Sequence, residues 1–113
     1  MEESILKSIK KLLGIAEDEH SFDVDIKIHI NSAIQILKQI GVQSTFEDFI
    51  LESEETTWND YLIDIEDLED VKTYIYLKVK IIFDPPTNSA VLQNYKELIK
   101  EYEWRLNSKK DYE

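Results

Sequence analysis

The sequence comprises 113 residues, of which 42% are hydrophobic, and its 24 acidic and 13 basic side chains give a formal net charge of −11 at pH 7. This length suits a single domain over residues 1–113 with a core of its own, and the hydrophobic content excludes a disordered chain. The chain has no cysteine, which excludes disulfide bonds and thiolate metal sites.

The sequence predicts no segment that directs the chain to a membrane. The first residues, MEESILKSIKK, lack the charge order and apolar core of a signal peptide. No run approaches the roughly 20 apolar residues that a membrane span requires. We therefore expect a soluble, intracellular protein without a membrane partner.

Turn-forming residues are scarce in this chain. Gly14, Gly41, Pro85 and Pro86 are its only glycines and prolines, whereas a sandwich or barrel needs a turn every 8–12 residues or so. Together with long periodic runs, this scarcity predicts an all-α fold. We expect a small bundle of about four main helices, with a long, acidic, partly ordered loop between the second and the third.

The first part of the chain predicts two helices that each end at a glycine. Apolar residues at helical spacing place the first helix at residues 2–13, before Gly14. The second is predicted over residues 23–40, before Gly41, with Ser21 or Asp23 as its N-terminal cap. Its opening, VDIKIHI, also alternates like a strand.

The net charge is concentrated in the middle of the chain. Between Gln39 and Val71 the sequence has eleven acidic residues and no lysine or arginine, and elsewhere 13 acids are balanced by 13 bases. The eleven acids are Glu47, Asp48, Glu52, Glu54, Glu55, Asp60, Asp64, Glu66, Asp67, Glu69 and Asp70. Such a segment repels nucleic acid and favours basic partners, although a solvated acidic loop is the simpler interpretation.

Residues 42–62 show no sustained periodicity, and a loop of this size in a small domain is usually functional or disordered. Its aromatic side chains argue for partial order, and we expect a short strand at residues 49–51 and a helical turn at residues 58–62. The aromatic residues are Phe46, Phe49, Trp58 and Tyr61.

The run over residues 71–86, VKTYIYLKVKIIFDPP, is the longest apolar-rich stretch and fits two periodicities. Val71, Ile75 and Val79 share one side in either a strand or a helix. The stretch is longer than a typical strand of roughly 5–6 residues, which favours a helix. Because residues before proline avoid the α region, this third helix is expected to end before Pro85.

A fourth helix is predicted after Thr87, capped by Asn88 or Ser89. Trp104 lies roughly opposite its apolar stripe, so it is either a contact residue for a partner or packed against a loop of its own chain. The polar residues 107–113 are predicted to form a flexible tail.

The sequence contains no arrangement of residues that is typical of catalysis. His20 and His29 fit no metal motif, and DVDIKI lacks the glycine of a calcium-binding loop. There is no glycine-rich phosphate loop and no nucleophile elbow. We therefore expect no catalytic, cofactor-binding or metal-binding residues, no cofactor and no enzymatic activity. The lysines are scattered and do not predict a DNA-binding face.

Several segments together resemble a known family. The run VKTYIYLKVKIIFDPPTNSAVLQNYKELIKEYEWRLN, over residues 71–107, resembles the small helical head–tail connector family of tailed bacteriophages and prophages. The upstream segments ILKSIKKLLGI and FDVDIKIHINSAIQILKQIGV fit the same family, as does the TTW before the third helix. The most specific parts are HINSAI (residues 29–34), FDPP (residues 83–86) and EWRLN (residues 103–107). The acidic middle loop matches least well.

The resemblance implies a structural protein that needs no cofactor. It implies assembly as a homo-oligomeric ring beneath the portal protein, where the ring extends the DNA channel and docks neck or tail-completion proteins. It also implies a place at the virion neck, reached from the bacterial host cytoplasm during assembly, with DNA passing nearby without specific binding.

This interpretation gives roles to two sets of residues. The aromatic residues expected at interfaces are Phe46, Phe49, Trp58, Tyr61 and Trp104. The acidic residues expected to face the channel or a partner are Glu47, Asp48, Glu52, Glu54 and Glu55. Two alternatives stay open: an acidic regulatory binding module that mimics DNA and occupies a basic nucleic-acid-binding protein, and an enzyme that uses clustered carboxylates.

Overall fold

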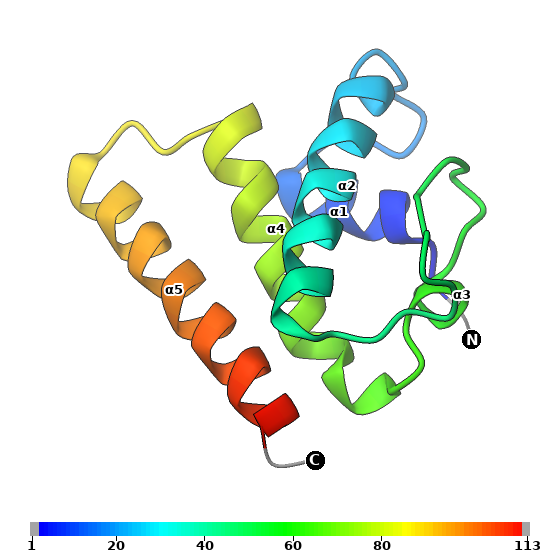
Figure 1. Cartoon of the computed structure of the whole chain (residues 1–113). Coiled ribbons are helices and arrows are strands. Elements are labelled where there is room, and N and C mark those ends of the chain that lie inside the picture. The colour runs from blue at the N-terminus through cyan, green and yellow to red at the C-terminus, as the bar shows by residue number, and fades with distance from the viewer. Residues whose placement is uncertain (1–2, 112–113) are drawn as a thin grey trace.

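The computed structural model describes residues 3–111, except for the side chains of residue 65 and residues 108–111. Within this range the chain forms α-helices, one short 3-10 helix and isolated β-bridges, but no strand (Figure 1). The elements are α1 (Ile5–Leu13), α2 (Asp23–Ile40), α3 (Trp58–Tyr61), η1 (Ile65–Asp67), α4 (Leu68–Phe83) and α5 (Ser89–Asp111). The predicted all-α fold with four main helices is confirmed.

Helix α4 is the centre of the structure, and the apolar run that fits two periodicities is therefore a helix. It contacts α1, α2 and α5. Among its residues only Glu69 and Ile82 are exposed, whereas a surface helix exposes a whole polar face. The near-continuous apolar sequence is thus explained by packing on several sides.

The end of α4 is set by the double proline, as predicted. Asp84 stands before Pro85 and leaves the helical conformation, with φ −149° and ψ 68°, because the ring of a following proline disfavours the α region. Its backbone N–H still donates to the carbonyl of Lys80 at 3.0 Å. Its carboxylate pairs with the Lys80 ammonium at 2.9 Å.

Helices α1 and α2 end as the sequence predicts. Gly14 and Gly41 adopt positive φ angles of 80° and 107°, a conformation in which only glycine avoids a steric penalty. The helix start at α1 uses Ser4, whose hydroxyl accepts the N–H of Lys7. At α5, Asn88 is the cap, since its side-chain oxygen accepts the N–H groups of Ala90 and Val91.

The predicted cap of α2 is wrong. Phe22 occupies the cap position and makes no side-chain hydrogen bond there. The Ser21 backbone N–H donates to the Glu19 carboxylate at 2.8 Å. Asp23 is the first residue of the helix, and its carboxylate is bonded instead to Lys10 and to the His20 ring at 2.8 Å. A long-range ion pair thus takes the side chain that local capping rules assign to the helix end.

Lys10 is a buried lysine, only 1% exposed, although it stands in a run of lysines that resembles a surface cluster. Its Nζ lies 2.9 Å from Asp23 and donates to the backbone carbonyls of Glu17 at 3.2 Å and of Glu19. These three partners match the three donors of an ammonium group. One side chain therefore joins α1 to the connecting segment and to the first turn of α2.

Helix α5 packs along one side of α4 (Figure 1). Ile99 is buried, and the Tyr74 hydroxyl of α4 donates to the Glu103 carboxylate at 2.7 Å. Burial, followed by the bond to Glu103, raises the pKa of the Tyr74 phenol, so it stays a hydrogen-bond donor at neutral pH. Of the predicted flexible tail, the backbone is helical to Asp111, and residues 112–113 lie outside the described residues.

A Lys10→Met substitution is expected to lower the free energy of unfolding by about 3–5 kcal/mol, because it leaves the carboxylate of Asp23 without its buried partner. Chemical denaturation followed by circular dichroism measures this change. Lys11→Met is the matched control, since Lys11 is exposed and its loss should change the stability by no more than about 0.5 kcal/mol. Equal effects of the two substitutions would contradict the assigned role of Lys10.

Stability is also expected to fall at acid pH through Asp23. Burial opposes ionisation of this carboxyl, but hydrogen bonds from Lys10 and His20 outweigh burial and lower its pKa. The ionised carboxylate therefore stabilises the fold above its unfolded-state pKa of about 3.9, and this contribution is lost as the pH falls through the folded-state pKa. In Asp23→Asn, the difference in stability from the parent chain should shrink at pH values below about 4. A constant difference across this range would rule the carboxyl out.

Candidate interaction surfaces

The acidic loop, defined here as residues 42–57, lies between α2 and α3 and is tied to the helices at both ends. Near its start, the Thr45 N–H donates to the Tyr61 carbonyl at 2.9 Å. Near its end, the Thr56 carbonyl accepts the N–H of Ile5, the first residue of α1, at 3.0 Å. The loop is therefore held against α1 and α3, and its outward side chains are presented from a fixed backbone.

The middle of the loop is held by one side chain of α2. The Asn31 amide nitrogen donates to the Leu51 carbonyl at 3.0 Å, and the Asn31 amide oxygen accepts the Leu51 N–H at 2.7 Å. An Asn side chain thus supplies the donor and acceptor that a neighbouring strand would supply. The predicted strand at residues 49–51 is wrong, but its alternation is real, because Phe49 and Leu51 are buried and Ile50 is 53% exposed.

Three of the aromatic residues expected at interfaces belong to the core of the chain itself. Phe49, Trp58 and Tyr61 are at most 8% exposed. Phe49 stacks on Tyr61 with ring centroids 4.8 Å apart, and the Trp58 indole N–H donates to the Ser8 hydroxyl of α1 at 3.1 Å. The helical turn predicted at residues 58–62 is confirmed as α3. Burial removes these three side chains from the candidate contact residues.

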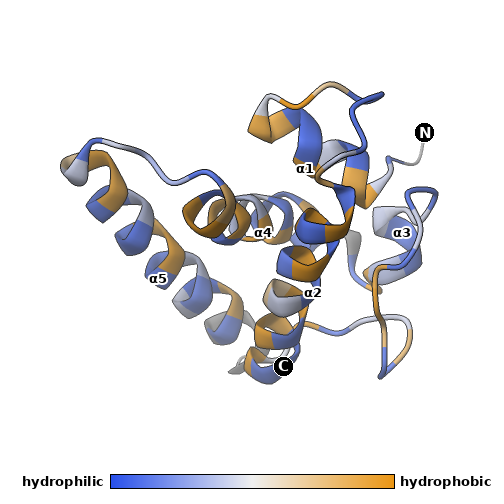
Figure 2. Cartoon of the chain, turned by 90° about the horizontal axis from the view of Figure 1, so that it is seen from above, coloured by the Kyte–Doolittle hydropathy of each residue, from blue (hydrophilic) through white to orange (hydrophobic). Residues whose placement is uncertain are grey.

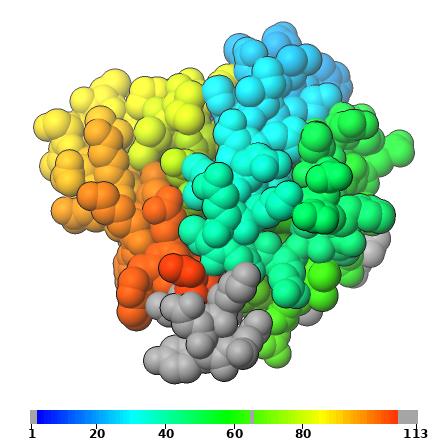
Figure 3. All heavy atoms as spheres, in the orientation of Figure 1, coloured from blue at the N-terminus to red at the C-terminus, as the bar shows by residue number. Residues whose placement is uncertain are grey.

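Phe46 and Trp104, by contrast, are 70% and 71% exposed. Phe46 lies on the acidic loop and Trp104 lies on α5, and Figure 3 shows these two elements at opposite sides of the molecule. Exposed aromatic side chains of this size are typical of binding surfaces. The two residues therefore mark two separate surfaces.

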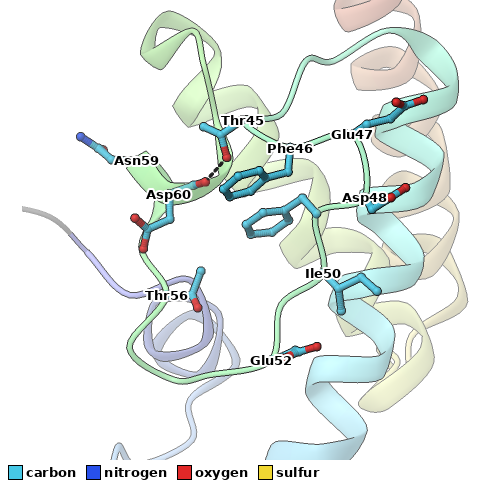
Figure 4. A pocket seen from close by; sticks show the side chains of 10 residues that line it. Thr45, Phe46, Glu47, Asp48, Ile50, Glu52, Thr56, Asn59 and Asp60 are labelled. Carbon is cyan, nitrogen blue, oxygen red and sulfur yellow. Dashed lines mark hydrogen bonds between the residues drawn. The ribbon is translucent and has the colours of Figure 1, made fainter.

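An open groove of ≈ 900 Å³ runs along the acidic loop (Figure 4). Phe46 and Ile50 supply its exposed apolar side chains, and its lining also includes the acidic residues Glu47, Asp48 and Glu52. We call these five residues the loop surface. Their carboxylates form no ion pair with any described side chain. The surface combines apolar contact area with uncompensated negative charge.

The remaining predicted acids, Glu54 and Glu55, are also exposed. The Glu54 carboxylate lies beside His20 and Asp23, with one ligand atom of each within 4.8 Å of the others. Two carboxylates and an imidazole are chemically able to hold a divalent cation. However, the Lys10 ammonium 2.9 Å from Asp23 already neutralises that carboxylate. The ion pair explains this cluster, and we assign no metal to it.

The family model described as phage connector protein matches residues 5–113 of the chain. The chain belongs to the phage connector protein family. This connector is accordingly a structural component of a phage, and its family implies contact with other head or tail proteins at the virion neck. No curated protein and no solved structure matches the chain. Among the described helices, none has the length and apolar character required to cross a membrane.

The three segments that carry the resemblance each hold a contact of the connector fold. HINSAI contains Asn31, which fixes the acidic loop. FDPP forms the corner between α4 and α5. EWRLN contains Glu103, the acceptor for Tyr74, and Arg105, which lies 3.6 Å from Asp70. The motifs thus have structural explanations.

Asn31→Ala is expected to destabilise the connector by about 1–3 kcal/mol, because both backbone groups of Leu51 lose their partner. Hydrogen exchange at the Leu51 amide should become faster. Asn31→Asp keeps the acceptor and loses the donor, so it should retain more of this protection than Asn31→Ala. Gln35→Ala, an exposed position on the same helix, is the control. Unchanged exchange at Leu51 in Asn31→Ala would contradict the assignment.

Proposed function

We propose that this connector is a structural, non-catalytic adaptor that assembles as a ring beneath the portal protein. The ring extends the DNA channel and docks a neck or tail-completion protein. The observation that carries the proposal is the family match over residues 5–113. The partners are further copies of the chain, the portal and the next neck or tail protein. The chain is made in the bacterial host cytoplasm and ends in the virion neck.

The charge distribution supports this role in a physical way. The exposed carboxylates of the acidic loop repel phosphate groups, so DNA passes the ring without adhering to it. Specific or tight DNA binding instead requires concentrated positive charge, which a chain of net charge −11 does not supply overall. The same carboxylates are suited to a basic patch on a protein partner.

The two exposed aromatic residues support more than one contact per subunit. Phe46 and Trp104 lie on elements at opposite sides of the chain (Figures 1 and 3). An adaptor within a stack of rings needs several contact surfaces, one for each neighbour. A simple binding module needs only one.

Electron cryo-microscopy of the phage neck tests this proposal. Particles with the gene for this connector intact should show ring density beneath the portal that fits α1, α2, α4 and α5, and particles that lack the gene should lose it. A neck resolved without density for this fold would overturn the proposal. A monomeric purified chain is compatible with it, because such a ring can require the portal as its template.

One observation favours a second candidate function: three exposed carboxylates of the acidic loop, those of Glu47, Asp48 and Glu52, form no ion pair with a described side chain. An acidic module that mimics DNA would bind a basic nucleic-acid-binding protein of the host through such a surface. That complex should weaken steeply between about 50 and 500 mM salt, whereas a largely apolar ring contact should change much less. Failure to capture any basic DNA-binding protein from host lysate at low salt would eliminate this candidate.

A further inference from the structure

A second groove, of ≈ 470 Å³, lies between α4 and α5. Its apolar lining includes Ile82, which is 56% exposed, and the buried Ile99. Three lysines also line it: Lys78 from α4 and Lys96 and Lys100 from α5. We call these five residues the lysine groove. It combines apolar contact area with positive charge on a chain that is strongly acidic as a whole.

The positive charge of the lysine groove has no ion-pair partner among the described side chains. Lys78, Lys96 and Lys100 make no ion pair with a described side chain, whereas the neighbouring Lys80 is paired with Asp84 at 2.9 Å. The carboxylate that also lines the groove, Glu103, accepts the hydrogen bond from Tyr74. Three ammonium groups therefore remain available for an acidic ligand.

Trp104 does not line this groove but follows Lys100 by four residues on α5. Residues four apart on a helix are neighbours on its surface, so the Trp104 side chain lies one turn beyond Lys100 on the same side of α5. Its 71% exposure leaves the indole ring open to a partner. The residues that contribute most to binding in protein interfaces are enriched in tryptophan. The groove therefore suits a ligand that is both apolar and acidic.

The loop surface has those two properties. Phe46 and Ile50 are exposed apolar side chains, and Glu47, Asp48 and Glu52 are exposed acids without a cationic partner. Two views place α5 and the α3 end of the acidic loop on opposite sides of the molecule (Figures 1 and 2). The loop of one copy therefore lies away from its own lysine groove. A second copy of the chain supplies the complementary surface.

We propose that the loop surface of one connector docks into the lysine groove of the next copy. This inference rests on the proposed ring and names the surfaces that form it. Contact between two different patches on opposite sides of a subunit is heterologous, and such contacts close into a ring when the rotation between subunits permits. Opposite charges fix which patch meets which, and like charges exclude loop-to-loop and groove-to-groove contacts.

Complementary charge reversals test the docking. The groove variant is Lys96→Glu/Lys100→Glu, and the loop variant is Glu47→Lys/Asp48→Lys. Each alone should weaken self-association on the portal by at least about tenfold, because like charges then face each other across the contact. An equal mixture should assemble again, since each loop then finds a groove of opposite sign on the other variant. Electron microscopy of portal complexes counts the assembled rings.

A matched control separates docking from net charge and from misfolding. Lys11→Glu changes the charge by the same amount as Lys100→Glu alone, at an exposed lysine that lines neither the lysine groove nor the groove along the acidic loop, and it should assemble like the parent chain. Circular dichroism checks that every variant keeps its helices. Assembly of the mixture independently shows that both variants fold, because misfolded chains would not rescue each other.

Zero-length carboxyl–amine cross-linking supplies a direct readout. With a mixture of ¹⁵N-labelled and unlabelled parent chains on the portal, cross-links should join Glu47 or Asp48 of one copy to Lys96 or Lys100 of another, within one ring.

Rings that form normally from each variant alone would overturn the docking while leaving the proposed ring intact. Assembly that is normal but accompanied by lost DNA retention in the groove variant would assign the groove to DNA and also overturn it. Absence of any ring from the parent chain would instead refute the proposed function.

Discussion

The burial of α4 on nearly every side is the constraint on which the rest of the structure depends. Because only Glu69 and Ile82 are exposed along it, the helix is stable only while α1, α2 and α5 all cover it. Each large apolar side chain that it buries contributes about 1.5–3 kcal/mol. Two other features keep these helices packed on α4. Pro85 turns the chain so that α5 returns along α4, and Lys10 of α1 pairs with Asp23 of α2 and so links these two helices.

Periodicity and breaker residues predicted the helices well because those signals are local. Gly14, Gly41 and Pro85 mark the C-terminal ends of α1, α2 and α4, so these ends could be predicted from the sequence alone. The central run could be assigned to a helix only through its length, because an apolar stretch buried on several sides satisfies both periodicities. Its surroundings, and not its own pattern, explain its composition.

The contacts that the sequence did not predict are long-range bonds between a side chain and a distant segment. Lys10 stands among lysines that suggest an exposed cluster, and only the fold shows its three partners. Asn31 is unremarkable in a helix, and its bonds to Leu51 cross the loop. Trp58 is likewise buried, with its indole N–H donating to the distant Ser8 hydroxyl. Composition predicted the acidic loop as a candidate site, but which of its side chains face outward follows from these anchors.

Asn31 holds the acidic loop with a side chain in the place of a neighbouring strand. An extended segment paired with a strand would leave a second backbone edge open, and such an edge is a template for aggregation. Here the backbone of Leu51 is paired with a single side chain that cannot be extended into a ladder. The alternating apolar residues of the loop are thus held in place without a partner strand.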